Sequence, residues 1–434
     1  MNANEIIRKK RDQEELSKEE IDFFIKEYCG GKIPDYQASS LLMAIYLNGM
    51  SQREISDLTM SMAHSGATLD LSSIPGIKVD KHSTGGIGDK VTLVVMPLVA
   101  SLGVPVAKMS GRGLGYTQGT IDKLESIPGF RTNISPEEFI ENVKKIGISI
   151  MSQQESIAIA DKKLYALRDV TSTVESIPLI ASSVMSKKIA AGADKILLEV
   201  TCGSGAFMDS PERARVLSET MVNIGKQVGK ETIAVITNMN QPLGRYCGNS
   251  LEVMEAIKIL NGEGEEDVVK VCTILAANML KLAGLGDNLG NNIKLIQRQI
   301  ENKQGLEKFK ELIEAQGGDS SILESPELLN MAKFKTAVTS QESGIIYEIE
   351  SKNIGKAIVE LGGGRKTKEE YIDNTIGIEV LKKIGDNVEI GEPLLYIYSN
   401  EKEKAEEQID FLRNSYKVGS NEVPPIEEIL DIIE

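Results

Sequence analysis

The chain of 434 residues has few of the side chains that bind zinc or form disulfides. It contains two histidines and four cysteines, and the cysteines are far apart in the sequence, at Cys29, Cys202, Cys247 and Cys272. None of them has the paired spacing of a zinc site, and a disulfide framework is not expected in so long a chain with so few cysteines. The composition therefore predicts reduced thiols and a cytoplasmic protein.

An excess of positive charge and long apolar runs are also lacking. The formal net charge is −15, which argues against nucleic acid or an anionic membrane surface as the main partner. The longest uncharged stretch, residues 91–107, contains Pro97, Gly103 and Pro105 and is shorter than the roughly 20 residues of a membrane-spanning helix. It predicts a buried helix followed by a buried strand. The first 20 residues are charged, so no signal peptide is expected.

Two segments rich in glycine and hydroxyl groups, residues 80–86 and 110–115, stand out in the first third of the chain. Each follows a short β-branched run, 77–79 or 104–107, and precedes an expected helix. A strand, a glycine-rich loop and a helix N-terminus together direct backbone N–H groups at an anion. Side chains that add donors are Lys81, Ser83, Ser110, Arg112 and Thr120.

We therefore predict a phosphate or phosphate-ester site. The spacing of Gly111, Gly113 and Gly115 resembles a dinucleotide-binding fingerprint only superficially. That fingerprint needs a later third glycine and an acidic residue after the next strand, and neither is clearly present.

The secondary-structure pattern predicts an α/β protein with a small all-helical domain, a large mixed-sheet α/β domain and a C-terminal α+β subdomain. The helical domain is expected at 1–65 and 160–192, the α/β phosphate-binding domain at 70–155 and 193–334, and the subdomain at 335–434. We expect the tail after Glu401 to be a solvated helix. The substrate cleft is expected between the domains, with hinges at the crossings 65–69, 155–160 and 192–195.

A third group of polar residues surrounds the helix expected to begin near residue 176. Ser183 and Lys187 are four residues apart, so their side chains share one helix face, and Arg168 precedes them. A hydroxyl, an ammonium and a guanidinium suit a planar ligand with several carbonyl oxygens. For Lys187 alone, a solvated helix face is the simpler interpretation.

These motifs together resemble the pyrimidine-nucleoside and thymidine phosphorylases over essentially the whole chain. The segments that carry the resemblance are 6–12, 81–89, 110–115, 119–130, 203–208, 241–244, 248–249 and 362–365, with Arg168, Ser183 and Lys187. The resemblance implies phosphorolysis of a uridine- or thymidine-type nucleoside to free base and pentose 1-phosphate, with inversion at the anomeric carbon. It also implies a homodimer formed by the N-terminal helices and no cofactor besides phosphate as co-substrate.

The resemblance also implies a role for each site residue. The phosphate ligands would be Lys81, Ser83, Thr92, Ser110 and Thr120. The base would be bound by His82, Arg168, Ser183 and Lys187, of which His82, Arg168 and Lys187 would be catalytic. These residues are expected in a cleft rather than in a core, so replacing Arg168 or Lys187 should remove activity and leave folding near normal.

Four positions depart from the family pattern. Tyr116 and Gln118 stand where the family has histidine and glycine, and Thr201 replaces a lysine. Because Tyr116 and Gln118 lie in the phosphate-binding turn, they are candidates for altered sugar specificity. In bacterial relatives a monovalent cation lies near Gly88, Leu243 and Glu255 with a hydroxyl from position 90. This chain has Lys90 there, whose ammonium would replace the cation, so no metal is expected.

Three alternatives remain at this point. One is a phosphorylase for a nucleoside with a modified sugar, and another is a catalytically silent nucleoside-binding relative. The third is a phosphoribosyltransferase of the anthranilate type, which also has glycine-rich loops after strands. That class needs acidic pairs for magnesium and pyrophosphate, and we find no convincing pair near the loops.

Overall fold

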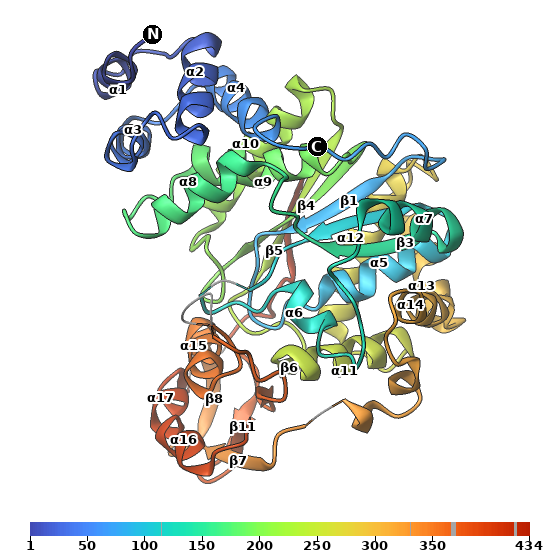
Figure 1. Ribbon diagram of the computed structural model, residues 1–434. Coiled ribbons are helices and arrows are strands. Elements are labelled where there is room, and N and C mark those ends of the chain that lie inside the picture. The colour runs from blue at the N-terminus through green and yellow to red at the C-terminus, as the bar shows by residue number, and fades with distance from the viewer. Residues whose placement is uncertain (114, 330, 366–369, 421–422) are drawn as a thin grey trace.

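The computed structural model describes residues 1–113, 115–329, 331–365, 370–420 and 423–434. Figure 1 shows a helical domain at the N-terminal end of the chain, a central α/β domain and a smaller C-terminal domain on the opposite side. The predicted fold class is confirmed. In the described part of the chain, no helix is long and apolar enough to cross a membrane.

The helical domain is formed by two separate stretches of chain. Its helices are α1 (Ala3–Arg11), α2 (Lys18–Cys29), α3 (Asp35–Asn48), α4 (Gln52–Ala63), α8 (Ile159–Asp169) and α9 (Ile177–Ala190). Capping boxes begin α2 and α4. The side chains of Ser17 and Ser51 each accept a hydrogen bond from the backbone N–H of the glutamate three residues on, and the carboxylate of that glutamate accepts one from the serine backbone N–H. Apolar side chains of α1–α4 and α8 share one core, which fixes how the helices pack.

The main sheet has the strand order β1-β4-β5-β13. Its strands are β1 (Val79–Ser83), β4 (Lys195–Cys202), β5 (Thr232–Asn238) and β13 (Ile429–Ile433). β1, β4 and β5 are parallel and β13 is antiparallel to β5. The parallel pair β2 (Val106–Ser110) and β3 (Ile148–Ser152) lies beside β1, where Lys108 Nζ donates to the Lys81 carbonyl at 2.6 Å. The ends of parallel strands therefore meet on one side of the domain.

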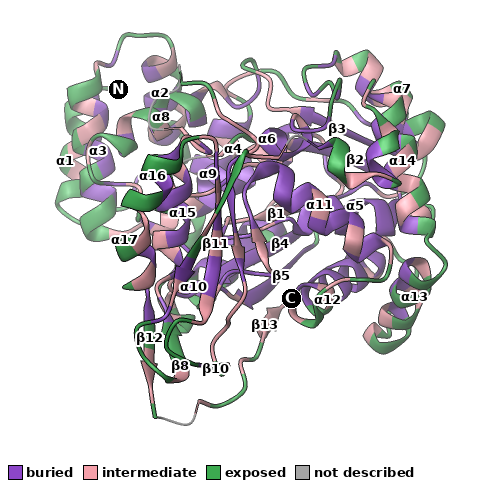
Figure 2. Ribbon diagram, turned by 90° about the horizontal axis from the view of Figure 1, so that it is seen from below, coloured by how far each residue is buried: buried purple, intermediate pink, exposed green. Residues whose placement is uncertain are grey.

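Helices cover this sheet on both faces. They are α5 (Val91–Ser101), α6 (Thr120–Leu124), α7 (Pro136–Ile146), α10 (Pro211–Gln227), α11 (Asn249–Leu260), α12 (Glu266–Leu282), α13 (Leu289–Glu301) and α14 (Gln304–Ala315), with short 3₁₀ turns at Ser320–Leu323 and Pro326–Leu328. Every residue of α5 except the last is buried, and Figure 2 shows α5 and α11 in the interior. The predicted buried helix and strand within 91–107 are confirmed by α5 and β2.

The C-terminal domain contains two small antiparallel sheets. One has the order β6-β9-β11-β7, formed by β6 (Tyr246–Cys247), β9 (Gly377–Val380), β11 (Pro393–Ser399) and β7 (Phe334–Thr339). The other joins β10 (Asn387–Val388), β8 (Gly344–Ile349) and β12 (Tyr416–Gly419). The helices are α15 (Ser351–Leu361), α16 (Lys402–Glu407) and α17 (Ile409–Arg413).

The chain after Glu401 differs from the expectation of one solvated helix. It forms α16 and α17 and then two strands, and β13 leaves the C-terminal domain to join the main sheet, as Figure 1 shows from the position of the C-terminus. β6 makes the opposite exchange, because it comes from the α/β part of the chain and pairs with β9. Both exchanges are long-range strand pairings, which local sequence patterns do not reveal.

The three segments that connect the helical domain to the α/β domain lie against one another. Ala67 forms a parallel bridge with Ile157, and its N–H donates to the Ser156 carbonyl at 2.7 Å. The Leu69 N–H donates to the Ala190 carbonyl at 2.9 Å, just before the third crossing. The crossings are therefore joined to one another by backbone hydrogen bonds.

Candidate active site

The predicted phosphate donors gather where β1 and β2 end and where α5 and α6 begin. Lys81 and Ser83 lie on β1, and Ser110 is the last residue of β2. Thr92 lies in the first turn of α5, and Thr120 is the first residue of α6. The expected strand at 77–79 is wrong in its bounds, because parallel pairing with β4 extends β1 through Ser83. Lys81 and Ser83 therefore lie on a rigid strand end rather than in a loop.

Lys81 is the charged member of this group and is completely buried. Its Nζ lies 2.5 Å from Glu199 Oε2 on β4 and 3.5 Å from Thr92 Oγ1. Burial disfavours the ammonium, but the carboxylates of Glu199 and Asp89 outweigh this and raise the pKa of Lys81. The ammonium stays charged and is held by the ion pair with Glu199 and a long hydrogen bond to Thr92.

His82 faces the opposite side of the sheet from Lys81, as successive residues of a strand do. Burial, followed by the positive charges of Lys188, Lys108, Lys187 and Lys81, holds the pKa of His82 well below its ordinary value. The imidazole is therefore neutral at pH 7, with one N–H donor and one acceptor nitrogen. It lies within the electrostatic reach of the predicted phosphate residue Lys81 and the predicted base residue Lys187.

A buried ion triad connects the helical domain to β1 and β2 beside His82. Lys188 on α9 donates to Asp80 Oδ2 at 2.8 Å and to the Met109 carbonyl at 3.1 Å. Lys108 Nζ lies 3.3 Å from Asp80 Oδ1. Burial and the neighbouring Lys188 hold the pKa of Lys108 well below its ordinary value, although Asp80 acts in the other direction. The triad fixes the position of α9 against the end of β1.

The structure brings the predicted pair on α9 together. Lys187 Nζ donates to Ser183 Oγ at 2.9 Å and to Asp161 Oδ2 on α8 at 2.6 Å. The Lys187 side chain is 20% exposed, whereas the Asp161 side chain is 6% exposed. Oδ1 of Asp161 has no hydrogen-bond partner among the described residues. Lys187 therefore presents a partly exposed ammonium held in place by two neighbours.

Arg168 does not lie in an open cleft. It is 2% exposed, and its guanidinium donates to the carbonyls of Thr173, Val174 and Leu179. Burial lowers the pKa of Arg168 to about 10, so it remains charged at neutral pH. The expectation that it lies in a cleft rather than a core is wrong, because its guanidinium is buried against three backbone carbonyls between α8 and the first turn of α9.

Tyr116 and Gln118 lie against the C-terminal domain. The Tyr116 ring packs against Phe207 with centroids 5.6 Å apart, and burial raises its pKa to about 12. Gln118 is buried, and both its amide atoms have no hydrogen-bond partner among the described residues. It lines a cavity of about 10 Å³ with Gly363 and Arg365. This volume holds about one water molecule and is too small for a pentose. A contact between Gln118 and a pentose would therefore require the loop to move, and such a contact stays a prediction.

Thr201 and Arg112, which the sequence singled out near the glycine-rich loops, both form contacts in or next to these loops. Thr201 donates to the Gly85 carbonyl at 2.5 Å and lies 3.0 Å from Thr84 Oγ1, so it closes the first loop. Arg112 is paired with Asp122 and Glu125 at 3.1 and 2.5 Å, which makes it a structural residue rather than a free donor for phosphate. Leu114 lies outside the described residues.

Lys90 occupies the position that the resemblance gives to a cation. Its Nζ lies 2.6 Å from the Leu243 carbonyl, 2.9 Å from the Tyr246 carbonyl and 2.5 Å from Glu255 Oε2. The side chain is fully buried. All four cysteines are free thiols, and in the described part of the chain no three His, Cys, Asp or Glu side chains are grouped as a metal site.

Three carboxylates at the site were not singled out from the sequence. Asp161 lies seven residues before Arg168, on the same face of α8, so helical spacing is a signal that reveals it. Glu199 pairs with Lys81, and its backbone lies opposite Ser83 in the parallel register. Asp80 joins lysines from β2 and α9. No local pattern identifies Glu199 or the partners of Asp80, because sheet and domain packing bring them together.

Three family models match the chain. The helical bundle domain of the glycosyl transferase family matches residues 4–66, and the a/b domain of that family matches residues 76–306. The pyrimidine nucleoside phosphorylase C-terminal domain matches residues 345–419. The three models follow one another in the order of the three structural parts.

The chain is also similar to whole proteins, two of them compared by sequence and one by structure. The chain is 53% identical to a pyrimidine-nucleoside phosphorylase of Staphylococcus haemolyticus and 52% identical to one of Bacillus subtilis, in each case over 98% of both chains. A solved structure of anthranilate phosphoribosyltransferase from Thermus thermophilus has a TM-score of 0.61 at 18% identity and covers 73% of this chain and 99% of its own. At that identity the likeness concerns the fold alone.

Proposed function

Because this chain belongs to the pyrimidine-nucleoside phosphorylase family, we propose that it cleaves a uridine- or thymidine-type nucleoside with inorganic phosphate. Phosphate attacks the anomeric carbon, the glycosidic bond breaks, and the products are the free base and a pentose 1-phosphate with inverted configuration. The observation that carries the proposal at the site is that the neutral, buried His82 lies within electrostatic reach of both Lys81 and Lys187. No cofactor other than phosphate as co-substrate is proposed.

Phosphate is proposed to bind on the α/β side of the site. Lys81 supplies a charged donor held by Glu199 and Thr92, and hydroxyl donors come from Ser83, Thr92, Ser110 and Thr120. The buried ammonium keeps its charge and is already oriented. Donors that are fixed before the reaction stabilise charge without reorganising, and the loss of one such donor typically lowers the rate about a hundredfold.

The base is proposed to bind on the helical side, at α8 and α9. Lys187 and Arg168 carry the positive charge that stabilises the negative charge of the departing base, and Ser183 adds a hydroxyl. His82 donates its N–H to the base carbonyl oxygen next to the glycosidic nitrogen. A neutral imidazole retains this donor over the physiological pH range. Asp161 orients Lys187 through their 2.6 Å hydrogen bond.

Catalysis is proposed to require the two sides to close on each other. The base ligands Arg168, Ser183 and Lys187 lie in the helical domain, whereas His82 and the phosphate ligands lie in the α/β domain. The two domains are joined by the three crossings. Gly192 begins the third crossing with a φ of +83°, and a Cβ there would lie 2.6 Å from the Leu69 carbonyl. Closure also excludes water, which would otherwise compete with phosphate.

The protein is proposed to be a cytoplasmic homodimer. Helix α3 presents a stripe of apolar side chains that protrude from the helical domain, namely Tyr36, Met43, Tyr46 and Leu47, with Tyr36 and Leu47 73% and 72% exposed. A second copy of the chain that covers this stripe would remove it from water. The free thiols of all four cysteines support a reducing compartment.

A panel of nucleosides with and without phosphate tests the proposed reaction. We expect free base to be released from uridine or thymidine when phosphate is present and pentose 1-phosphate to form in equal amount. Lys187→Met should lower the rate at least a hundredfold, whereas Lys162→Met on an exposed face of α8 should not change it. Release of base without phosphate, or no release from any pyrimidine nucleoside, would contradict the proposal.

A further inference from the structure

The ammonium of Lys90 has a complete set of oxygen partners inside the protein. The Leu243 and Tyr246 carbonyls and the Glu255 carboxylate lie 2.6, 2.9 and 2.5 Å from Nζ. An ammonium has three N–H donors, so each donor has one acceptor. Gly88 adds close backbone packing, because a Cβ at that position would lie 3.1 Å from Nζ. The site is fully formed and closed around the charge.

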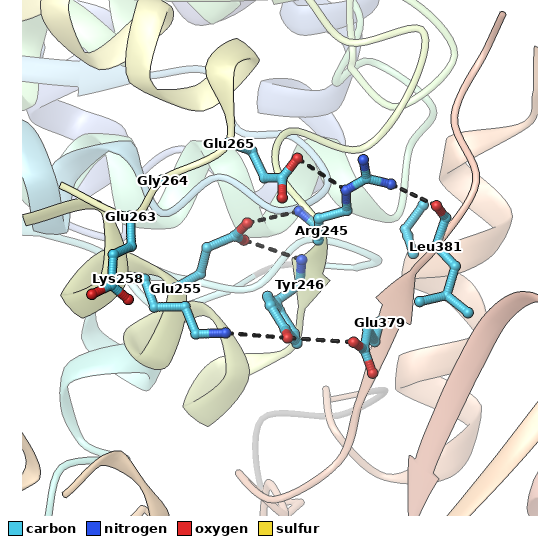
Figure 3. Close-up of a pocket in the computed structure, with 10 residues that line it drawn as sticks. Arg245, Tyr246, Glu255, Lys258, Glu263, Gly264, Glu265, Glu379 and Leu381 are labelled. Atoms are coloured by element: carbon cyan, nitrogen blue, oxygen red, sulfur yellow. Dashed lines mark hydrogen bonds and ion pairs between the residues drawn. The ribbon is translucent and has the colours of Figure 1, made fainter. Parts of the chain in front are cut away.

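The oxygen cage is held together by contacts that do not involve Lys90. Glu255 accepts hydrogen bonds from the backbone N–H groups of Arg245 at 2.8 Å and Tyr246 at 3.1 Å, as Figure 3 shows. Burial opposes the charge on Lys90, but Glu255 and Glu252 outweigh it and raise its pKa above the ordinary lysine value. The carboxylate and the carbonyls would therefore remain converged on the same point without the lysine side chain.

Two carbonyl oxygens and a carboxylate are ligands that suit a monovalent cation. The family resemblance implies such a cation here, but the residues of this chain do not fit one, because the Lys90 ammonium takes the same oxygens. We infer that Lys90 is a covalently tethered replacement for the monovalent cation, which makes this protein independent of that cation and holds the start of α5 in place.

The position of Lys90 connects this site to phosphate binding. It is the N-cap residue of α5 and lies two residues before Thr92, which contacts Lys81. Its acceptors lie on the segment that leads into β6, a strand of the C-terminal domain sheet, and on α11. Lys90 is thus a positioning residue that ties the phosphate donors to the C-terminal domain.

A pocket lies beside the cage. Glu255 lines a pocket of about 340 Å³ between α11 and β9, together with Arg245, Tyr246, Glu263 and Glu265 (Figure 3). The glutamates make this entrance attractive to cations. We expect a cation from this pocket to occupy the oxygens that a shorter side chain at position 90 leaves vacant.

The test compares the full-length protein with the Lys90→Ser variant in potassium chloride and in choline chloride at equal ionic strength. We expect the wild-type melting temperature and KM for phosphate to be the same in both salts. The variant should melt several degrees lower in choline and recover with a saturable dependence on potassium. Its KM for phosphate should fall at least tenfold on adding potassium. The phosphate readout rests on the proposed function, whereas the melting readout does not.

Lys10→Ser is the matched control. Lys10 forms a similarly buried pair with Glu54, at 2.9 and 3.1 Å to the two carboxylate oxygens, and within the described residues its ammonium donates to no backbone carbonyl. This variant should lose stability equally in both salts. A potassium-dependent rise in wild-type stability or activity would overturn the inference. So would a Lys90→Ser variant that behaves alike in both salts or is unfolded in both, whereas folding in potassium alone would support it.

Discussion

Arg168 and Lys187 carry the same expected role, but their surroundings make them different kinds of residue. Arg168 is buried and satisfies three backbone carbonyls, whereas Lys187 is partly exposed and contacts two side chains. Removing a buried donor leaves its acceptors unpaired, which costs more than losing a partly hydrated contact. The two residues should therefore separate stability from activity.

We predict that Arg168→Met lowers both stability and activity. The three carbonyls it serves would lose their donor, and the free energy of unfolding should fall by about 3 kcal/mol. Lys187→Met should abolish most activity with a much smaller change in melting temperature. Thermal denaturation of the two variants measures the change in stability, and their phosphorolysis rates measure the change in activity. Equal melting temperatures for the two variants would show that the carbonyl contacts of Arg168 contribute little.

Among the elements, β13 depends most on distant parts of the chain. Its Leu430 and Ile433 pack on the α9–α10 side of the sheet, and Ile429 and Ile432 pack on the other side. An ion pair of Lys281 with Glu434, the residue after the strand, fastens its end at 2.6 Å. The strand thus covers the edge of β5, which would otherwise expose a row of unpaired backbone groups.

We predict that truncation after Pro425 destabilises the protein and makes it aggregate. The edge of β5, whose residues 233–236 are apolar and buried, would then be available to pair with other chains. Light scattering during heating and the melting temperature are the measurements. Asp431→Asn, which keeps the strand and its apolar contacts, is the control and should melt close to the wild type. A truncated chain that stays monodisperse on heating would show that β13 is dispensable.

For the whole molecule, the division into domains separates most of the proposed base ligands from the proposed phosphate ligands. Figure 1 shows α8 and α9 on the same side as the N-terminal helices and the ends of β1 and β4 in the central domain. The Asp80 triad and the three crossings join these two bodies close to His82, and α4 and α9 also pack on α10 and β4 through a shared apolar cluster. Motion about this connection would change the distance between the base and phosphate residues.

We predict that solution scattering detects both the dimer and its closure. The scattering mass should correspond to two chains at micromolar concentration, and the radius of gyration should fall when phosphate and a pyrimidine nucleoside bind together. Tyr36→Lys combined with Leu47→Lys should halve the mass, because charge at the α3 stripe opposes its burial. A wild-type protein with the mass of one chain would refute the dimer, and an unchanged radius with both ligands bound would refute closure.

What the sequence by itself determined are features whose signal is local. The capping boxes, the buried run of α5 and the Ser183–Lys187 pair follow from spacing along one helix. The family motifs likewise identified the chemistry, and Lys90 was recognisable as a charge in place of a hydroxyl. These properties depend on residues a few positions apart or on short motifs.

Only the tertiary structure decided which residues are partners across the fold. Glu199 became the partner of Lys81, and Arg168 became a buried structural cation, through contacts between segments that the sequence does not relate. The extension of β1 and the return of β13 to the main sheet are strand pairings of the same kind. Strand pairing and burial depend on the neighbours that the chain brings together, so local propensity cannot supply them.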